Sequence, residues 1–411
     1  MSEVARHRPG PPRKPPLKSK DIRGAKYLHN ILDLLAPLRS HRNCPNRELH
    51  YDEYVAHVLL YLFTPALTSL RGMQQASTLK KVHSRLGLKR FSLGSFSEAS
   101  RVFDPAELQL IIGELVGQVG DLGEHPKLSA LDLAVTAYDG TLLRALPKML
   151  WALWRCDEHR AARMHLEYEV LKGVPTHATI TDAHTSEGAV LRAHLAPGKL
   201  YVLDRGYADY ALMADIRAAG SSFVVRLHNN AVYDLVEEKP LSDAARRAGI
   251  QKDRLVRLGS KFAPELRDRD IRLVEIYVRD TDKLLGRKRK RRVASKKTYR
   301  TDRGDYTLLL ATDQLDLDVE LIALLFRSRW QIELFFRWFK KVLEADHLLS
   351  LSQNGLTIVA YCALIASLLI TLWTGRKPTK RTLEMLSFYY AGWADEEELA
   401  AHIEALQPAD A

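Results

Sequence analysis

Cysteine is scarce in this chain of 411 residues, and its scarcity excludes a fold held together by disulfides or by a structural zinc ion. The three cysteines, Cys44, Cys156 and Cys362, lie far apart and form no CxxC pair. A disulfide scaffold needs several pairs of cysteines, and structural zinc sites commonly show CxxC or similar short ligand spacings. We therefore expect a protein of a reducing cytoplasm.

The sequence also lacks the motifs of several enzyme classes. It has no GxxxxGK[ST] loop for nucleotide phosphates, no GxSxG elbow, no HExxH and no GxGxxG after an apolar strand. These absences disfavour P-loop NTPases, serine hydrolases, zinc peptidases and dinucleotide-dependent enzymes. Residues 1–21 lack the apolar core of a signal peptide and are typical of a flexible, basic, proline-rich tail.

One long apolar run stands out at residues 356–373, which carry no charged side chain. A run of this length can cross a membrane as a helix. The segment contains Thr, Ser, Tyr and Cys, and polar sequence follows it, so a buried core helix is the favoured interpretation.

Acidic residues are outnumbered in this sequence. Lys and Arg total 61 against 50 Asp and Glu, for a formal net charge of +11. Basic side chains that neutralise phosphates supply most non-specific affinity for nucleic acids, so the excess predicts a polyanionic partner. Charge alone does not separate DNA from RNA or from an acidic membrane. The run RKRKRR predicts a solvated loop that contacts phosphates, with a solvated loop that has no partner as the alternative.

The remaining chain divides into four parts by its patterns. Residues 22–120 show helical periodicity without a strand pattern, which predicts an all-helical N-terminal domain. Residues 128–230 show three strand patterns and then alternating helix and strand, which predicts the first part of a mixed-sheet α/β core. Residues 231–313 become a charged, β-rich insertion that we expect to lie apart from the central sheet. Residues 314–404 return to helices that complete the core.

Two aspartates follow apolar strand patterns in that core. Asp139 ends VTAYD and Asp204 ends YVLD, and the nearby glycines, Gly140 and Gly206, permit the tight turns that strand ends need. Carboxylates at such positions often belong to active sites, but Asp followed by Gly is also ordinary turn chemistry. Asp132 competes for the first position, although it lies within its run.

A line of charge crosses the aromatic stretch FRSRWQIELFFRWFKK. Phe326, Arg329, Glu333, Arg337 and Lys340 follow one another at steps of three and four, which places them on one face of a helix. An amphipathic helix with an ordinary Arg-Glu pair on its solvated face would show the same spacing. The apolar side chains around this line instead predict a helix buried on most sides, where a charged face needs a partner.

Glu333 joins the two aspartates as a third acidic candidate. Three carboxylates without histidine or cysteine suit Mg²⁺ or Mn²⁺, which can activate a water and stabilise the leaving oxygen in phosphodiester displacement. Arg329 and Lys340 would then face a phosphate backbone. His165 alternates into a neighbouring strand and could approach the site, but a structural histidine is the favoured interpretation.

The same stretch resembles the signature Tyr-(2)-Arg-(3)-Glu-(6)-Lys of bacterial insertion-sequence transposases of the IS-four group, with Phe326, Arg329, Glu333 and Lys340 at its four positions. Further motifs similar to this group occur in the same order, namely YDGTLLRALP, RMHLEYEVLKGVP, YVLDRGYADY and HLLSLSQNG. GLKRFSLGSFSEASRVFDP resembles its N-terminal domain, and TGRKPTKRTLEML with GWADEEEL resembles its C-terminal end. The likeness therefore runs from about residue 22 to 404.

This resemblance implies a DDE transposase with an RNase H-like core that is interrupted by the β-rich insertion. It assigns Asp139, Asp204 and Glu333 to a catalytic triad that binds Mg²⁺, with Mn²⁺ as a substitute. Members of the group cut DNA at element ends with a metal-bound water and use the freed 3′-hydroxyl for hairpin formation or strand transfer. The implied partners are double-stranded DNA, as terminal inverted repeats and target, and a second copy in a paired-end complex. The implied location is the bacterial cytoplasm at the nucleoid, without a membrane.

The resemblance also assigns residues that bind DNA. Arg329 and Lys340 match basic residues that hold phosphates near the transposon end, and Trp330 matches an aromatic residue that often follows the arginine. The complete predicted DNA-binding set comprises Phe326, Arg329, Trp330, Arg337, Lys340, Arg287, Lys288, Arg289, Lys290, Arg291, Arg292, Lys296 and Lys297.

One position departs from the signature. Phe326 stands where the group has tyrosine, so a phosphate contact through the hydroxyl is lost while ring packing can remain. Two alternatives to a complete transposase therefore stay open. One is a catalytically inactive protein that binds element ends, and the other is an RNase H-like nuclease that cuts without strand transfer.

Overall fold

The computed structural model describes residues 33–40, 47–64, 67, 69–80, 82–83, 87–122, 126–144, 148–152, 160–259, 264–278, 306–343, 349–391 and 393–405. The tail at residues 1–21 and the basic run from Arg287 to Lys297 lie outside these residues. The predictions made for those two segments therefore stay predictions.

The N-terminal part consists of helices, as its periodicity predicts. They are η2 (Ala36–Ser40), α2 (Tyr51–Phe63), α3 (Leu70–Ala76), α5 (Leu93–Val102) and α6 (Ala106–Gln118). Within the described ranges, no strand precedes residue 134. Aromatic contacts join these segments, because the ring of Tyr51 stacks on that of Phe103 at 4.3 Å and the ring of Tyr54 packs at a tilt 4.5 Å from that of Phe96.

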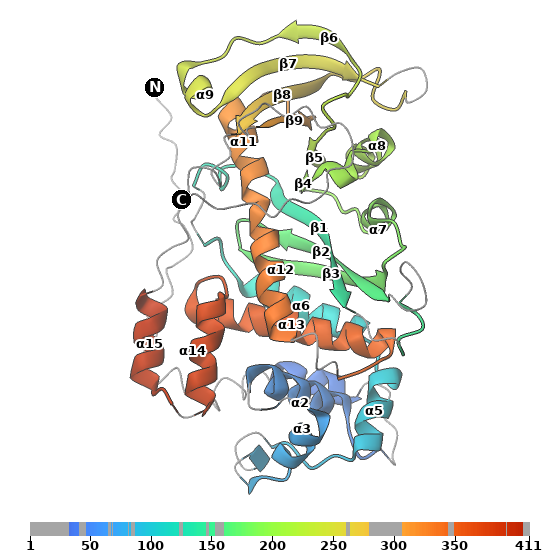
Figure 1. Cartoon of the computed structure of the whole chain (residues 1–411), viewed down its shortest axis with the longest axis vertical. Coiled ribbons are helices and arrows are strands. Elements are labelled where there is room, and N and C mark those ends of the chain that lie inside the picture. The colour runs from blue at the N-terminus through green and yellow to red at the C-terminus, as the bar shows by residue number, and fades with distance from the viewer. Residues whose placement is uncertain are drawn as a thin grey trace, which may run out of the picture.

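In the part of the chain that the structure describes, one mixed sheet contains nine strands, in the order β3-β2-β1-β4-β5-β9-β8-β7-β6 (Figure 1). The strands are β1 (Ala134–Arg144), β2 (Ala161–Glu169), β3 (Val174–Asp182), β4 (Lys199–Leu203), β5 (Ser222–Arg226), β6 (Tyr233–Glu238), β7 (Ile250–Leu258), β8 (Ile271–Val278) and β9 (Tyr306–Thr312). β1 pairs antiparallel with β2 and parallel with β4, and β4 pairs parallel with β5. The three strand patterns predicted at the beginning of the core are β1, β2 and β3, and the alternating pattern that follows them contains β4 and β5.

The strands of the 231–313 segment continue the central sheet, so the expectation that this segment lies apart from the sheet is wrong. β9 pairs with β5 through Val224↔Thr312, and β8, β7 and β6 follow antiparallel. The unpaired edge of β5 needs hydrogen-bond partners, and the chain returns at the end of the insertion to supply them. A short helix, α9 (Asp243–Arg247), lies between β6 and β7.

A buried ion pair anchors this outer part of the sheet. Arg272 on β8 donates to Asp253 on β7 from both Nε at 2.9 Å and Nη2 at 2.7 Å. Its Nη1 also donates to the carbonyl oxygen of Leu315 at 3.1 Å and to that of Leu317. Because these carbonyls lie just before the next helix, the pair ties the outer strands to the C-terminal helices.

Helices cover both faces of the inner sheet. α11 (Val319–Ser328), α12 (Trp330–Leu343) and α13 (Gln353–Thr374) share a core with Val135 and Ala137 of β1. α7 (Glu187–Ala193) and α8 (Tyr210–Ala218) share a second core with Tyr138 of β1 and Leu203 of β4. Since side chains alternate along a strand, even-numbered positions of β1 near residue 138 face α7 and odd-numbered positions face α12.

α13 is the long apolar segment, and it is a core helix as predicted. It is long and apolar enough to cross a membrane, but 89% of its 18-residue apolar window is buried inside the protein. Tyr361 donates from its hydroxyl to the carbonyl oxygen of Ala178 at 2.6 Å, and Asn354 donates to that of Phe103 at 2.7 Å. The helix therefore joins the N-terminal helices to the sheet. α14 (Lys380–Ala391) and α15 (Glu396–Ala405) lie beyond it (Figure 1).

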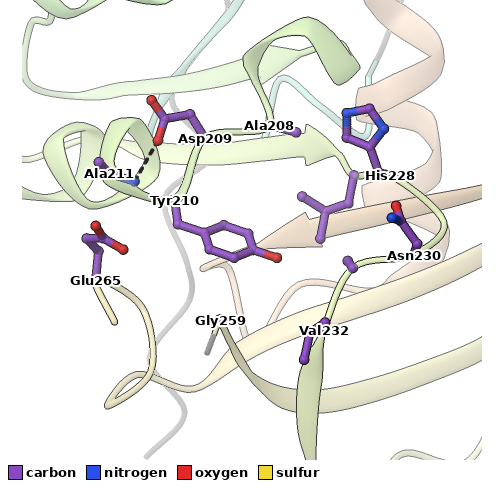
Figure 2. Close-up of a pocket in the computed structure, with 11 residues that line it drawn as sticks. Ala208, Asp209, Tyr210, Ala211, His228, Asn230, Val232, Gly259 and Glu265 are labelled. Atoms are coloured by element: carbon purple, nitrogen blue, oxygen red, sulfur yellow. Dashed lines mark hydrogen bonds between the residues drawn. The ribbon is translucent and has the colours of Figure 1, made fainter. Parts of the chain in front are cut away.

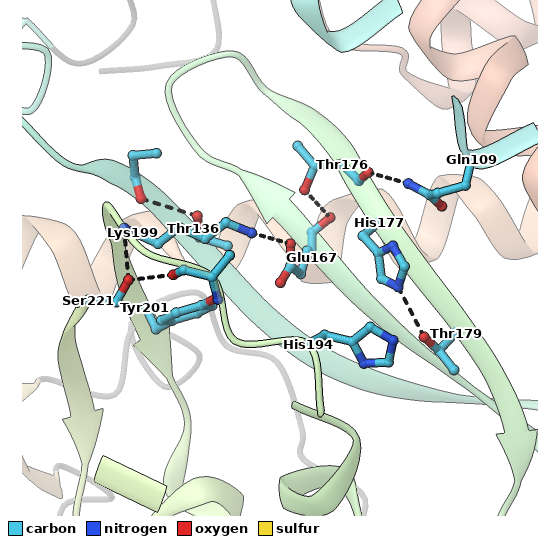
Figure 3. Close-up of polar contacts among 12 residues, drawn as sticks. Gln109, Thr136, Glu167, Thr176, His177, Thr179, His194, Lys199, Tyr201 and Ser221 are labelled. Atoms are coloured by element: carbon cyan, nitrogen blue, oxygen red, sulfur yellow. Dashed lines mark hydrogen bonds and ion pairs between the residues drawn. The ribbon is translucent and has the colours of Figure 1, made fainter. Parts of the chain in front are cut away.

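Polar contacts on the α7 side of the sheet tie β2 to β4 (Figure 3). Lys199 Nζ donates to Glu167 Oε2 at 2.6 Å, and the Glu167 side chain is only 3% exposed. Ser221 Oγ accepts from the backbone N–H of Lys199 at 3.0 Å. These contacts hold the beginning of β4, whereas the candidate site lies at its end.

Candidate active site

Asp139 and Asp204 are neighbours because of the register between β1 and β4. The parallel pairing runs from Ala134↔Lys199 to Tyr138↔Leu203, and the next residue on each strand is an aspartate. β4 ends there, and Asp204 opens the short turn η3 (Arg205–Tyr207). The register therefore places both carboxylates where the parallel pairing stops.

Asp139 does not end its strand, so the expected strand boundary is wrong. β1 continues to Arg144 because it stays paired with β2, where Asp139 lies opposite Leu166. Gly140 is therefore not a turn residue, and its φ is not positive. A Cβ at Gly140 would lie 3.0–3.3 Å from the carboxyl atoms of Glu187, so this glycine provides space for a close approach.

The single helix predicted for the stretch from Phe326 to Lys340 is two helices that meet at Arg329. α11 ends at Ser328 and α12 begins at Trp330, although they run almost end to end (Figure 1). Ser328 Oγ donates to the carbonyl oxygen of Leu325 at 2.7 Å, and the Arg329 N–H donates to that of Phe326 at 3.3 Å. Such contacts compete with regular helical hydrogen bonds and tighten the turn.

Arg329 brings the first and third acidic candidates together. Its side chain is 10% exposed, and its guanidinium lies 3.5 Å from Asp139 Oδ2 and 2.6 Å from Glu333 Oε1. The ring of Phe326 lies 5.7 Å from the same guanidinium. Asp204 has a cation of its own, because Arg226 Nη1 lies 3.5 Å from Asp204 Oδ1.

The environment of Asp139 disfavours its charged form. Burial raises the pKa of Asp139 to about 6, and the negative charges of Glu187 and Asp204 act in the same direction. The guanidinium of Arg329 and the amide of Gly140, which donates to Asp139 Oδ1 at 2.8 Å, oppose that rise. Asp139 should therefore bind a cation more strongly as pH rises, because a larger fraction of its carboxyl group is deprotonated.

Trp330 and the remaining residues of the charged line face outward. Trp330 is 52% exposed, and the guanidinium of Arg337 lies 5.6 Å from its ring centroid. Lys340 belongs to the exposed residues, but the part of its side chain that is buried lowers its pKa. The structure thus gathers Phe326, Arg329 and Glu333 at the carboxylates and places Trp330 and Arg337 on the open surface beside them.

The two competing candidates lie elsewhere. Asp132 precedes β1. His165 is 1% exposed, its Nε2 lies 2.9 Å from Thr181 Oγ1, and burial lowers its pKa to about 4. It is therefore a structural histidine, as the favoured interpretation has it.

Glu187 is a residue that the sequence did not single out. It lies behind β1 from Asp139, where its Oε1 pairs with Arg163 Nη1 at 2.7 Å and its Oε2 accepts from the Tyr207 hydroxyl at 3.0 Å. In sequence it resembles the ordinary first-turn glutamate of a helix capped by Ser186. Its partners come from β2 and from the turn after β4, which lie far from each other in sequence.

A pocket of about 670 Å³ opens where the segments after β4 and β5 face each other. The ring of Tyr210 projects into it, with His228 and Asn230 on one side and Glu265 on the other (Figure 2). None of the three acidic candidates lines this pocket. The pocket is thus not part of the candidate site.

The acidic residues fit a hard divalent cation by their chemistry, because carboxylate oxygens are the ligands that Mg²⁺ and Mn²⁺ prefer. Among the residues that the structure describes, no three acidic, histidine or cysteine side chains stand close enough to hold one metal ion as they are placed. The guanidinium of Arg329 lies between Asp139 and Glu333 instead. The space between these carboxylates thus already accepts a positive group.

Comparison with known proteins identifies the family. The family model described as "Transposase DDE domain" matches residues 131–369, which include Asp139, Asp204 and Glu333. A protein of Sinorhizobium fredii named as transposase y4zB is 28% identical over 215 residues, which are 52% of this chain and 53% of that protein. A transposase named for insertion sequence element IS5377 of Geobacillus stearothermophilus is 24% identical over 242 residues, 59% of this chain and 56% of that protein.

A transposase named for element IS4SA of Synechocystis is 20% identical over 303 residues, 73% of this chain and 77% of that protein. The chain spans little more than half the length of the first two relatives. A piggyBac transposase synaptic complex with hairpin DNA aligns with a TM-score of 0.37 and 8% identity, over 94% of this chain and 83% of that one, which does not establish a common fold. The match to the family model covers more than half of the sequence, and the chain belongs to the transposase DDE domain family.

Proposed function

We propose that this chain is an insertion-sequence transposase that cleaves DNA at the ends of its element and joins those ends to target DNA, with Asp139, Asp204 and Glu333 as the catalytic triad. One observation supports the proposal most: the β1–β4 register makes Asp139 and Asp204 neighbours, and the buried Arg329 contacts both Asp139 and Glu333. An ion pair with a purely structural role needs one acidic partner, whereas Arg329 contacts two carboxylates. The relatives' names as transposases of insertion sequences support the same activity.

The inner sheet supports an RNase H-like core as the catalytic scaffold. Its order β3-β2-β1-β4-β5, with an antiparallel β1–β2–β3 meander and parallel β4 and β5, presents the first two aspartates on adjacent strands. Glu333 lies on α12, which packs on the face of the sheet opposite to α7. The Phe-Arg-Glu-Lys spacing supports placement in the IS-four group, and one relative is named for element IS4SA.

Asp139, Asp204 and Glu333 would hold Mg²⁺, or Mn²⁺ in its place. When bound, the metal would activate a water or 3′-hydroxyl and stabilise the leaving oxygen of the phosphodiester. Arg329 would give up its contact with Asp139 and hold a phosphate near the cleaved bond, for which the planar guanidinium is well suited. Phe326 supports that guanidinium by its ring face, a contact that needs no tyrosine hydroxyl.

DNA would lie along the exposed side of α12. Trp330, Arg337 and Lys340 project there beside the carboxylates, and basic side chains at such a surface bind phosphates. The N-terminal helices and the run Arg287–Arg292, with Lys296 and Lys297, would grip the terminal repeats and neighbouring DNA. Two copies would meet on paired ends, in the bacterial cytoplasm at the nucleoid.

The test is an assay for strand transfer. The purified protein is incubated with Mg²⁺, a DNA that carries the element's native ends and a supercoiled target plasmid. We expect end-labelled DNA to become joined to the plasmid. Cutting without joining would instead show a nuclease, and binding of the ends without cutting would show an inactive end-binding protein.

A further inference from the structure

Glu187 contacts three segments that meet behind the candidate active site. It belongs to α7, and its carboxylate binds Arg163 on β2 at 2.7 Å and the Tyr207 hydroxyl at 3.0 Å. The same carboxyl group lies against Gly140 on β1. One side chain thus touches the residue after Asp139 and the turn that follows Asp204.

The contact with Tyr207 reaches Asp204 directly. Tyr207 is only 2% exposed, and its N–H donates to the carbonyl oxygen of Asp204 at 3.0 Å. Its ring packs edge-on against Tyr138, with centroids 5.7 Å apart, and Tyr138 is the residue before Asp139. Tyr207 therefore links the two aspartates from behind the sheet, and Glu187 holds Tyr207 by its hydroxyl.

The contact with Gly140 reaches Asp139. Since side chains alternate along β1, Glu187 faces Gly140 and Tyr138 on the α7 side, while Asp139 faces Arg329 on the α12 side. Glu187 is therefore not a ligand beside Asp139. Its carboxylate supports the strand from the opposite face.

We propose that Glu187 is a positioning residue that fixes the spacing of Asp139 and Asp204 and thereby sets the affinity of the site for a divalent cation, a role that rests on the metal-dependent reaction proposed above. Groups that orient ligands through their neighbours commonly change metal affinity by about 10- to 100-fold when they are removed. Arg163 lies 2.7 Å from Glu187 and offsets part of the negative charge that Glu187 adds near Asp139.

The test is a double-mutant cycle between Glu187→Ala and Gly140→Ala, read by Mn²⁺ binding to the full chain without DNA. We expect Glu187→Ala to weaken Mn²⁺ binding about 10-fold or more. Gly140→Ala should do the same, because its new methyl group displaces the carboxylate. Once residue 187 is alanine, Gly140→Ala should have little further effect. Glu167→Gln, a change to a buried carboxylate on the same face, should leave Mn²⁺ binding unchanged.

A second readout does not depend on metal. Hydrogen exchange should become faster in Glu187→Ala at the amides of Tyr207 and Ala208, which hold the turn after Asp204, while α13 keeps its protection. Unchanged exchange there, or an equal effect of Gly140→Ala with and without Glu187, would overturn the positioning role. If the parent chain fails to bind Mn²⁺ but exchange changes as expected, the positioning role stands and the proposed metal chemistry fails.

Discussion

The carboxyl of Asp139 illustrates how a single residue connects stability to activity. Burial raises its pKa from 3.8 to about 6, so between these values the folded chain holds a proton that the unfolded chain has lost. The stability of the metal-free protein should therefore fall as pH rises through this window. A divalent cation binds this carboxylate only in its deprotonated form. The bound cation would then offset the unfavourable burial of the negative charge.

The first prediction concerns Asp139→Asn, which removes this titration. We compare the free energy of unfolding of the variant with that of the parent, without metal. The difference, variant minus parent, should be larger at pH 8 than at pH 4, by at most roughly 3 kcal/mol for a pKa shift of this size. Urea unfolding at both pH values measures the difference. An Asp139→Asn variant whose stability relative to the parent does not depend on pH would contradict the raised pKa.

A second prediction concerns Arg329, whose charge lowers the pKa of Asp139. In Arg329→Gln the pKa should rise further, so the pH at which Mn²⁺ binding reaches half its strength should move upward from the parent's value. Titration calorimetry between pH 5 and 8 tests the direction. Arg226→Gln, which alters the partner of Asp204 instead, serves as the comparison. A downward movement for Arg329→Gln would show that Arg329 only competes with the metal.

At the scale of elements, sequence periodicity predicted α13, the strands of the inner sheet and the triad candidates, because each leaves a local pattern. It predicted the wrong end for β1, since nothing in YDGT shows that β2 continues to pair with it. It also predicted one helix where Arg329 separates two, because the hydroxyl contact of Ser328 is not a periodic signal. Glu187 was missed for a related reason, as its partners come from segments distant in sequence.

The exposed side of α12 yields the third prediction. Arg337→Ala should weaken binding to unrelated DNAs about equally and reduce the salt slope of the binding constant by about 1, because a phosphate contact carries no sequence information. Thermal stability should change little, since Arg337 is exposed. Lys380→Ala, at a 66% exposed side chain on α14, is the control that we expect to bind normally. Selective loss of affinity for one sequence would contradict a backbone contact.

At the scale of the whole molecule, the sheet runs without interruption from the inner strands into the 231–313 segment. Sequence reasoning treated that segment as separate because its charged composition differs from that of the core. The buried pair of Asp253 and Arg272, with side chains 3% and 6% exposed, joins the outer strands to the segment that leads into α11. The helices that carry Arg329 and Glu333 are thereby held by both halves of the sheet.

The fourth prediction follows from that anchor. Arg272→Ala should lower the free energy of unfolding by about 3–5 kcal/mol, because it leaves Asp253 charged and buried without a partner. Arg257→Ala breaks an exposed pair with Asp270 in the same segment and should cost no more than about 1 kcal/mol. Urea denaturation of the two variants measures both values. Equal costs would show that the outer strands are not anchored through Arg272.

We propose that Asp139, Asp204 and Glu333 form one metal-dependent DNA-cleaving site. The most direct measurement is Mg²⁺-dependent cleavage of DNA that carries the element's native ends, by the parent, Asp139→Asn and Glu333→Gln at matched DNA occupancy. We predict that the parent cuts at the ends, while both variants bind the ends and do not cut. A parent that binds but never cuts with Mg²⁺ or Mn²⁺, or a variant that still cuts, would contradict the claim.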